Sequence, residues 1–525
     1  MAKIAYILLC HKDPDAIIAQ ANQLTAAGDC MAIHFDARAN PADYIRIHNA
    51  LQDNPNVTFA TKRVKCGWGE WSLVQATLNG LQSAVDTFPR ATHFYMLSGD
   101  CMAIKTAEYT HHFLDENDYD LIESHDFFAS NWIKTGMKED RLIYRHHFNE
   151  RTQAGRFYAA YEFQKRFRLT RNIPDDIQVM IGSQWWCLRR RTVEMILEFL
   201  RQLRDVFRFF STTWIPDETF FQTLVRHLIP KEEIENRTPT FLMFSDYGMP
   251  VTFYNDHYDM LLGQDYLFAR KISPDAQDLK DRLGALYAST GIDFPISDEG
   301  RNLHAFLTGR GRVGRRFGQR FWELGNTLGP ERELYLVVCK KWHVAKRLVA
   351  QIARETGIPC VDYLFNEQDT PLPDLGGIEA TLVKRSRHRR AVVRMLFEQF
   401  GTQQLVLCLD PANLDVIRDL CGDAAATHVL EIDCEYSDEY LIGHARRVGL
   451  AGENSPRDSV ARLLPAIRND LAYESEQIRG NGLDAHLRIR QAAGRAENES
   501  AICTFLGVDR DTAQAIMRLD YLFLD

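Results

Sequence analysis

Short apolar runs alternate with amphipathic stretches along the first third of the chain. Four runs have the length and the β-rich composition of buried strands: residues 4–10, 31–36, 57–61 and 93–98. Between them, residues 16–26 and 72–85 carry apolar side chains at helical spacing. Strands that alternate with helices predict an α/β domain with a largely parallel sheet.

A second α/β pattern occupies the last third of the chain. We predict strands at 334–339, 404–410 and 428–432, helices at 344–355 and 414–421, and a mostly helical end. Residues 306–321, between the two patterns, are rich in arginine and glycine, which is typical of a linker. The predicted parts are a first domain at 1–275, a helical and Arg/Gly-rich linker at 276–332, and a second domain at 333–525.

The predicted turn after residue 339 is similar to a phosphate-binding loop, because Lys346 stands where the lysine of that loop would. Lys340 and Ala345 occupy its glycine positions, and Arg347 replaces the hydroxyl residue that would hold magnesium. Backbone amides cannot easily cradle a triphosphate there. We predict a degenerate P-loop fold without NTPase activity, and leave open whether this domain grips an acceptor, dimerises or has a second activity.

Composition excludes several classes of protein. The 525 residues are 25% charged and 45% hydrophobic, which excludes a disordered or fibrous chain. The formal net charge of −9 argues against a dedicated nucleic-acid binder. Eleven cysteines without a C-x-x-C pair fit a reducing cytosol. No apolar run approaches the ~18 residues that cross a bilayer, so we predict a cytoplasmic protein without a transmembrane segment and leave peripheral membrane contact open.

Polar residues follow each predicted strand of the first domain. Lys12, Asp36, Lys62 and Asp100 lie within a few residues of the four strand ends. In open α/β sheets, ligands bind just beyond the carboxyl ends of the strands. Together the four clusters predict one crevice, although each cluster taken singly is more typical of a solvated loop.

The motif formed by Pro216, Asp217 and Glu218 is the most informative one. Proline followed by two acids is a favourable helix start, so capping is one interpretation. The nearby Trp214 and Phe220 would partly desolvate a carboxylate and suit the face of a sugar. Adjacent acids on a helix point ~100° apart, so they cannot flank a glycosidic bond as a hydrolase pair does. A single general base is the more natural role.

Arg270 and Lys271 are an adjacent cation pair. Arginine can bind two phosphate oxygens and lysine adds a point charge, so the pair could neutralise a leaving diphosphate without a metal. Tryptophans also stand beside glycines at 67–71 and 182–186, where a flat ligand could stack close to the backbone. Surface charge and core packing are the alternative interpretations of these two features.

Seven motifs in order resemble one known family. They are YILLCHK at 6–12, IHFD at 33–36, the Trp68 segment, LSG at 97–99, GSQWW at 182–186, PDE at 216–218 and FARK at 268–271. The set, over about residues 3–273, is similar to the core-2/I-branching β-1,6-N-acetylglucosaminyltransferases and peptide O-xylosyltransferases, glycosyltransferase family 14. This resemblance implies a GT-A fold, a UDP-sugar donor, inversion of the anomeric centre and no metal or other cofactor. We expect a bacterial member with an extra C-terminal domain.

The resemblance also implies roles for single residues. Glu218 would be the general base that takes the acceptor hydroxyl proton, while Arg270 and Lys271 would hold the UDP diphosphate. The remaining implied contacts are Asp36 with the uridine, Trp68 with the donor pocket, and Ser183, Gln184 and Trp185 with the donor sugar.

The chain departs from the family pattern after the fourth predicted strand. The family usually reads Ser-Gly-x-Asp-Tyr-Pro, whereas Cys101 stands here at the place of the aspartate. Asp100, one residue earlier, is the candidate replacement. The donor stays open between UDP-GlcNAc and UDP-xylose, because residues 71–79 resemble the N-acetylglucosaminyl branch and Trp68 with Gly69 resembles the xylosyl branch.

We expect the acceptor to be a carbohydrate or glycoprotein hydroxyl, in surface polysaccharide biosynthesis. Two other functions remain as alternatives. One is a metal-dependent GT-A transferase in which Asp118 and Asp120 form a D-x-D site, since paired carboxylates suit hard cations. The other is a non-catalytic glycan-binding scaffold.

Overall fold

The computed structural model describes residues 2–133, 136–243, 250–296, 327–480, 486–519 and 521–525. The chain forms two compact units, Met1–Arg316 and Phe317–Asp525. Residues 306–321, the Arg/Gly-rich core of the predicted linker, lie outside the described residues. The domain boundaries at 275 and 332 therefore stay predictions.

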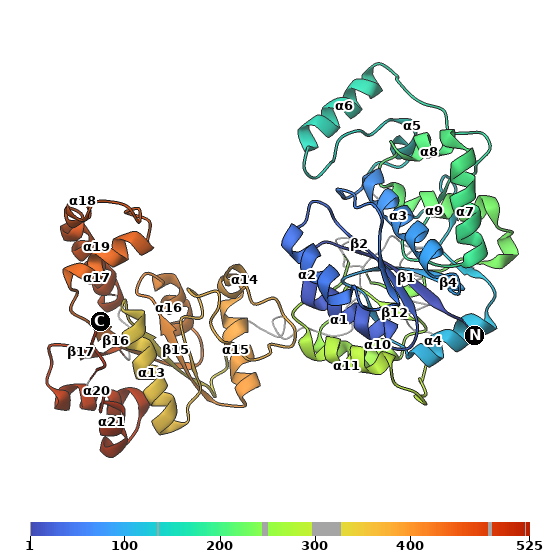
Figure 1. Ribbon diagram of the computed structural model, residues 1–525. Helices are drawn as coiled ribbons and strands as arrows, with labels where there is room; N and C mark the ends of the chain where they lie inside the picture. Colours follow the sequence, from blue (N-terminus) through green and yellow to red (C-terminus); the bar gives the residue numbers. More distant parts are fainter. Residues whose placement is uncertain (1, 134–135, 244–249, 297–326, 481–485, 520) are drawn as a thin grey trace. The chain divides into compact units, whose positions relative to one another are not determined.

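The first unit is built on a seven-stranded mixed sheet with the order β10-β6-β9-β4-β1-β2-β3 (Figure 1). Its strands are β1 (Ile4–Cys10), β2 (Cys30–Phe35), β3 (Val57–Phe59), β4 (His93–Ser98), β6 (Asp120–Leu121), β9 (Cys187–Arg189) and β10 (Ile234–Glu235). Strands β1 to β4 run parallel, and β9 runs antiparallel to both β4 and β6. The expected α/β domain with a mostly parallel sheet is confirmed.

Two small sheets extend this unit. One has the order β11 (Thr240–Phe241), β12 (Phe268–Ala269) and β5 (Met102–Ala103), and the other pairs β7 (His125–Asp126) with β8 (Met180–Ile181). In the first small sheet, β12 pairs antiparallel with β5. This pairing brings the chain after residue 269 beside the chain after β4.

Helices cover the main sheet because its central strands are buried along nearly their whole length. All six residues of β2 and all but one of β1 are buried, which requires cover on both faces. The helices of the unit are α1 (Pro14–Thr25), α2 (Pro41–Leu51), α3 (Trp71–Thr87), α4 (Ala107–Glu116), α5 (Asp140–Ile143), α6 (Ala154–Arg166), α7 (Arg190–Gln202), α8 (Arg204–Phe210), α9 (Phe220–Leu228), α10 (Tyr258–Leu262) and α11 (Gln277–Tyr287). Within the described part of the unit there are also three short 3₁₀ helices, η1 (Pro216–Glu218), η2 (Lys231–Glu233) and η3 (Asn255–His257).

The second unit contains a five-stranded, wholly parallel sheet with the order β14-β15-β13-β16-β17. Its strands are β13 (Glu333–Val338), β14 (Cys360–Val361), β15 (Gln404–Leu409), β16 (Ala426–Asp433) and β17 (His486–Arg490). Its helices are α13 (Trp342–Thr356), α14 (Leu382–Arg387), α15 (Arg389–Phe400), α16 (Leu414–Cys421), α17 (Asp438–Arg447), α18 (Arg457–Ala461), α19 (Leu464–Arg479), α20 (Arg495–Leu506) and α21 (Arg510–Ile516). A second α/β domain was expected, and β17 was not.

Two lysines of the β13–α13 region form ion pairs with acids that follow β14 and β15. The Lys346 ammonium lies 2.6 Å from the Glu367 carboxylate, and Lys340 lies 3.0 Å from Asp410. Both lysines are thus paired with carboxylates, whereas a phosphate would need them as its own cationic partners. The likeness to a degenerate P-loop stays a prediction.

A search of the described residues for a helix long and apolar enough to cross a membrane found none.

Candidate active site

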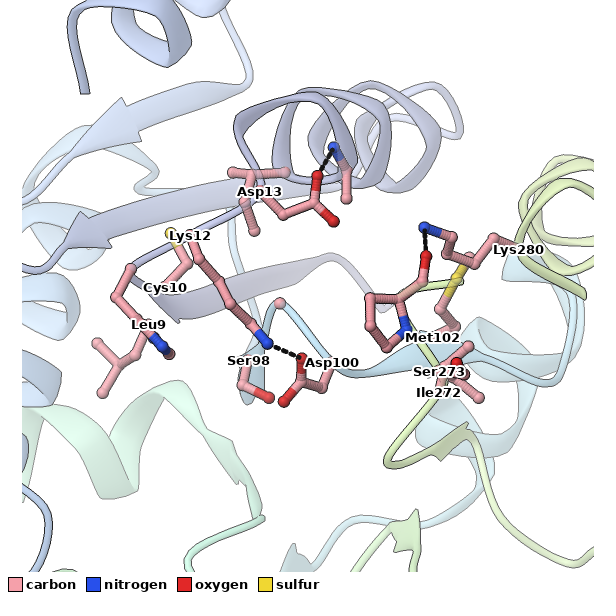
Figure 2. Close-up of a pocket in the computed structure, with 15 residues that line it drawn as sticks. Leu9, Cys10, Lys12, Asp13, Ser98, Asp100, Met102, Ile272, Ser273 and Lys280 are labelled. Carbon is pink, nitrogen blue, oxygen red and sulfur yellow. Dashed lines mark hydrogen bonds and ion pairs between the residues drawn. The ribbon is translucent and has the colours of Figure 1, made fainter. Parts of the chain in front are cut away.

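The carboxyl ends of β1 and β4 line a small cavity (Figure 2). Lys12 follows β1 and Asp100 follows β4, and their side chains point toward one another with the ammonium nitrogen 3.8 Å from the carboxylate oxygen Oδ1. Ser98 and Ser273 also line the cavity. The predicted convergence of strand ends is therefore present for β1 and β4.

Asp36, at the end of β2, holds the neighbouring loop. Its Oδ1 accepts hydrogen bonds from the backbone N–H groups of Arg38, at 2.8 Å, and Cys66, at 3.1 Å. The side chain thus fixes the start of the segment that leads to Trp68. The predicted contact with uridine remains untested.

Arg270 and Lys271 come directly after β12, beside the end of β4. The backbone N–H of Ile272 donates to the Asp100 carbonyl oxygen at 2.9 Å, which ties the two segments together. The Arg270 guanidinium lies 4.0 Å from the centre of the Trp185 ring. Arg270 therefore stacks on a residue from another of the predicted motifs.

Four cations lie close together in this part of the unit. Burial lowers the pKa of Lys271, and the nearby charge of Arg270 lowers it further; Lys12 and Arg151 act in the same direction, while Asp100 opposes them. Arg151 itself stacks on Trp68, with its guanidinium carbon 3.9 Å from the ring centre. Mutual repulsion of this kind favours an anionic ligand, which would relieve it.

The segment 182–185 connects β8 toward β9. The Ser183 N–H donates to Glu123 Oε2 at 3.0 Å, and the Ser183 Oγ accepts from the Trp185 N–H at 3.3 Å. A Cβ on Gly182 would lie 1.8 Å from the Glu123 carbonyl oxygen, so only glycine fits there. Gln184 is half-buried, whereas Ser183 and Trp185 are buried. This packing holds the segment in one conformation.

Glu218 ends η1 and forms an ion pair with Arg141, whose Nη1 lies 3.0 Å from Oε2. The Arg141 side chain is 9% exposed and that of Glu218 is 24% exposed, so the carboxylate reaches solvent while the guanidinium is buried behind it. Arg141 also lies 5.1 Å from the Trp214 ring centre. A buried cation with a fixed partner gives the carboxylate a defined orientation.

The turn before η1 is held by the Trp68 segment. Ile215 adopts a left-handed backbone with φ 54°, which is unfavourable for a β-branched residue. Its N–H donates to the Gly69 carbonyl oxygen at 3.0 Å, and the rings of Trp214 and Trp68 lie 6.4 Å apart, edge to face. The surrounding contacts thus enforce a turn that the local sequence disfavours.

Asp217 and Glu218 differ in environment. Asp217 Oδ1 is inaccessible and has no hydrogen-bond partner among the described residues. Burial, followed by the nearby charge of Glu218, raises the pKa of Asp217 to about 7. The predicted helix start is confirmed, since η1 begins at Pro216 with both acids in its first turn. Of the two acids, only Glu218 pairs with Arg141.

Five of the predicted site residues form a ring of neighbours with Trp214, Arg141 and Arg151. In order they are Glu218, Arg141, Trp214, Trp68, Arg151, Lys271, Arg270, Trp185 and, through segment 182–185, Glu218 again. The link between Arg151 and Lys271 is the electrostatic repulsion between their charges. Segment 182–185 lies next to Glu218 because the Gly182 N–H donates to the Glu218 carbonyl oxygen at 2.9 Å. Three Cα steps of 3.8 Å separate Gly182 from Trp185, at most about 11 Å. The proposed base and the cation pair therefore border the same short segment.

Cys101 is fully buried where the family carries an aspartate. Its Sγ lies 3.4 Å from the Ser98 hydroxyl, and burial raises the pKa of the thiol while the charge of Arg270 opposes that rise. Asp100 lines the cavity with its side chain 26% exposed. Whether Asp100 takes over the function of the missing aspartate stays a prediction.

Asp118 and Asp120 both bind Arg189. Asp120, with a fully buried side chain, lies 2.9 Å from the guanidinium and also accepts from the Thr192 hydroxyl at 2.7 Å. Asp118 lies 3.1 Å from the same guanidinium, and Glu233 completes the cluster. The D-x-D pair thus anchors Arg189, which gives these acids a structural role and weakens the metal-dependent alternative.

Two arginines of the ring were not anticipated. Arg141 and Arg151 lie in a stretch without regular periodicity, and neither belongs to the seven motifs. Their positions depend on tertiary packing around Trp68 and Trp214. The only local signal was the high arginine content between 141 and 171.

Two family models match the chain. Residues 4–259 match the model of the Core-2/I-Branching enzyme family. Residues 270–525 match a family of unknown function, DUF5928. Arg270 and Lys271 thus lie outside the first match, although they belong to the first compact unit.

Several curated proteins are similar to the chain. Over 233 residues it is 23% identical to mouse beta-1,3-galactosyl-O-glycosyl-glycoprotein beta-1,6-N-acetylglucosaminyltransferase 4. The aligned stretch covers 42% of this chain and 47% of the mouse protein. The type 3 enzymes of sheep and cattle are each 24% identical over 228 residues, with the same coverage. The chain thus spans about half the length of the curated relatives it matches. Through residues 4–259, the chain is similar to the Core-2/I-branching enzyme family.

Proposed function

We propose that the first unit transfers N-acetylglucosamine from UDP-GlcNAc to a hydroxyl group of a glycan or glycoprotein acceptor, with inversion at the anomeric carbon. The observation that carries this proposal is the ring that links Glu218 with Arg270 and Lys271 through Trp185 and through Trp68. A carboxylate and a cation pair that border one short segment, residues 182–185, are the parts that a single displacement at a nucleotide sugar needs. The names of the curated relatives support GlcNAc over xylose as the donor sugar.

Glu218 acts as the general base in this proposal. It takes the proton of the acceptor hydroxyl as the hydroxyl oxygen attacks the anomeric carbon, and the bond from that carbon to the diphosphate oxygen breaks. Arg141 keeps the carboxylate in one position without itself contacting the reacting atoms. General-base catalysis of this kind contributes roughly 10²–10⁴-fold.

Arg270 and Lys271 stabilise the negative charge that grows on the departing UDP. Arg270 is pre-positioned by its stacking on Trp185, so little reorganisation is needed as the charge develops. Lys12 and Arg151 add positive potential nearby. These cations offer the charge that a divalent metal supplies in other transferases, and we propose that the reaction needs no metal.

The remaining donor contacts in this proposal are those that the family resemblance implies. Asp36 would meet the uridine, Trp68 would line the donor pocket, and Ser183, Gln184 and Trp185 would border the sugar. Trp68 is 41% exposed and therefore accessible to a ligand. Action in the cytoplasm on a surface polysaccharide of a bacterium is part of the same proposal.

The test is UDP release from UDP-GlcNAc and from UDP-xylose, measured with and without a panel of soluble oligosaccharides and with and without EDTA. We expect faster release from UDP-GlcNAc, acceleration by at least one oligosaccharide, and no loss of rate in EDTA. Loss of activity in EDTA that manganese restores would contradict the metal-free mechanism. Release no faster than the uncatalysed background from either donor would favour the non-catalytic scaffold.

A further inference from the structure

Helix α6, at the margin of the first unit in Figure 1, packs against the rest of the unit along one side only. Phe157 and Tyr161, four residues apart, are buried on that side. The Phe157 ring lies 5.7 Å from the ring of Trp214, and the Tyr161 hydroxyl donates to Asp140. This buried side anchors the helix next to the ring of active-site residues.

The opposite side of α6 exposes large apolar side chains. Phe163 is 56% exposed and Phe167 is 57% exposed, and Leu169, just past the helix, is 47% exposed. At 3.6 residues per turn, Phe163 and Phe167 share a face that lies roughly opposite Tyr161. Their rings are 4.7 Å apart, so they form one apolar patch. Single exposed apolar residues are ordinary, but a cluster of them marks an interaction site.

Cations surround this patch. Arg156 and Arg166 share the outer face of α6, and Arg168 follows Phe167 directly; all three are exposed. Between residues 154 and 169 the chain carries four basic side chains and one acid, Glu162, whereas the whole chain has a net charge of −9. We call Arg156, Phe163, Arg166, Phe167, Arg168 and Leu169 the α6 face.

The end of α6 holds these residues in a defined turn. The Leu169 N–H donates to the Gln164 carbonyl oxygen at 2.9 Å, and the Arg168 N–H donates to that of Lys165 at 3.2 Å, which is a Schellman cap. Such a cap needs a left-handed residue, usually glycine, and Arg168 takes that position with φ 55°. A cation thus stands where glycine would be less strained, and strain of this kind clusters at functional sites.

We propose that the α6 face docks the protein on the surface of an anionic phospholipid bilayer. Phenylalanine and leucine beside lysine and arginine on one helix face are the composition of interfacial helices, whose apolar side enters the headgroup boundary while the cations meet anionic lipids. The positive patch on a negatively charged protein matches a negative surface. No acid on the α6 face opposes this attraction, since Glu162 lies about 100° around the helix from Phe163.

Docking by this face places the bilayer close to the active site. Helix α6 has 13 residues, so it is about 20 Å long. Its start lies three residues after Arg151, which stacks on Trp68. The patch therefore lies about one helix length from the proposed donor site. This step rests on the proposed function: at such a distance from the bilayer, the active site suits an acceptor that is carried on a membrane lipid.

Vesicle flotation tests the proposal with the full chain. The probes are vesicles of phosphatidylcholine alone and of phosphatidylcholine with 30% phosphatidylglycerol. We expect the wild type to float with the anionic vesicles, with at least tenfold weaker binding to the neutral ones and in 0.5 M salt. The double variant F163S/F167S and the double variant R166Q/R168Q should each reduce the partition coefficient at least tenfold.

The control is Ile45→Ser, which removes an apolar side chain of equal exposure, 56%, from α2. It should bind vesicles like the wild type, and circular dichroism should show every variant folded. Absence of wild-type flotation, or equal flotation of F163S/F167S, would overturn the proposal. A wild-type dimer that F163S/F167S converts to a monomer, without vesicle binding, would show that the face joins two copies instead.

Failure of the docking proposal can be distinguished from failure of the proposed function. UDP release from soluble UDP-GlcNAc involves no residue of the α6 face, so F163S/F167S should retain the wild-type rate in solution. A wild type that releases UDP but binds no vesicles would refute only the docking surface.

Discussion

Asp217, beside the proposed base, is half-buried with its Oδ1 inaccessible, and replacing it with asparagine should change how stability depends on pH. Burial raises its pKa from 3.8 to about 7 in the folded protein. Because the folded pKa lies above the unfolded one, the folded state binds the proton more tightly. This group therefore costs no stability below about pH 4 and costs progressively more as the pH rises from about 4 to 7, with a plateau above.

The size of the effect follows from the two pKa values. One pKa unit corresponds to about 1.4 kcal/mol. At pH 5 the wild type is destabilised by about 1.5 kcal/mol through this group, and at pH 8 by about 4 kcal/mol. An asparagine side chain at this position cannot ionise and has nearly the same shape. The difference in unfolding free energy between Asp217→Asn and wild type should therefore shift by about 2.5 kcal/mol in favour of the variant between pH 5 and pH 8.

Urea unfolding followed by tryptophan fluorescence measures this shift. Asp176→Asn is the matched control, because Asp176 is an exposed acid of the same unit. We expect the control to differ from wild type by a constant amount at both pH values. A difference for Asp217→Asn that does not change between pH 5 and pH 8 would refute the claim that Asp217 is desolvated in the folded protein.

Three further substitutions probe the site. Replacing Arg270 and Lys271 together with alanine should weaken UDP binding about 150-fold or more in calorimetry, because each lost charge-assisted hydrogen bond costs about 1.5–3 kcal/mol; unchanged affinity would show that the clamp lies elsewhere. Arg141→Ala should lower kcat about 100-fold at unchanged UDP affinity, with partial rescue by Arg141→Lys, and equal rates for all three proteins would remove the positioning role. Asp100→Asn should lower kcat/KM for the donor about tenfold, whereas an unchanged value would show that Asp100 does not replace the missing aspartate.

The central strands β1 and β4 could be predicted because they are long and almost fully buried. The bounds of β1 and β4 coincide with the predicted runs 4–10 and 93–98, since continuous burial leaves continuous apolar sequence. The two-residue strands β5 and β12 could not be found, because so short a pairing leaves no periodicity. Yet their pairing brings Arg270 to the end of β4.

The site residues likewise divide into those that the local sequence reveals and those that only tertiary packing positions. Glu218, Arg270 and Lys271 stood out through local composition and the family resemblance, and the structure places them around one segment. Arg141 and Arg151 could not be foreseen, because a lone arginine has the same local pattern whether it lies on the surface or binds Glu218. Which of two adjacent acids pairs with a buried cation is a property of tertiary packing, as Asp217 and Glu218 illustrate.

The central claim is that Glu218 takes the acceptor proton while a metal-free cation pair holds UDP. Its most direct test is the UDP release rate of Glu218→Gln from UDP-GlcNAc in EDTA, with UDP affinity measured on the same preparation. We predict a rate at least 100-fold below that of wild type, at a UDP affinity within threefold of it. A variant that releases UDP as fast as the wild type would contradict the account.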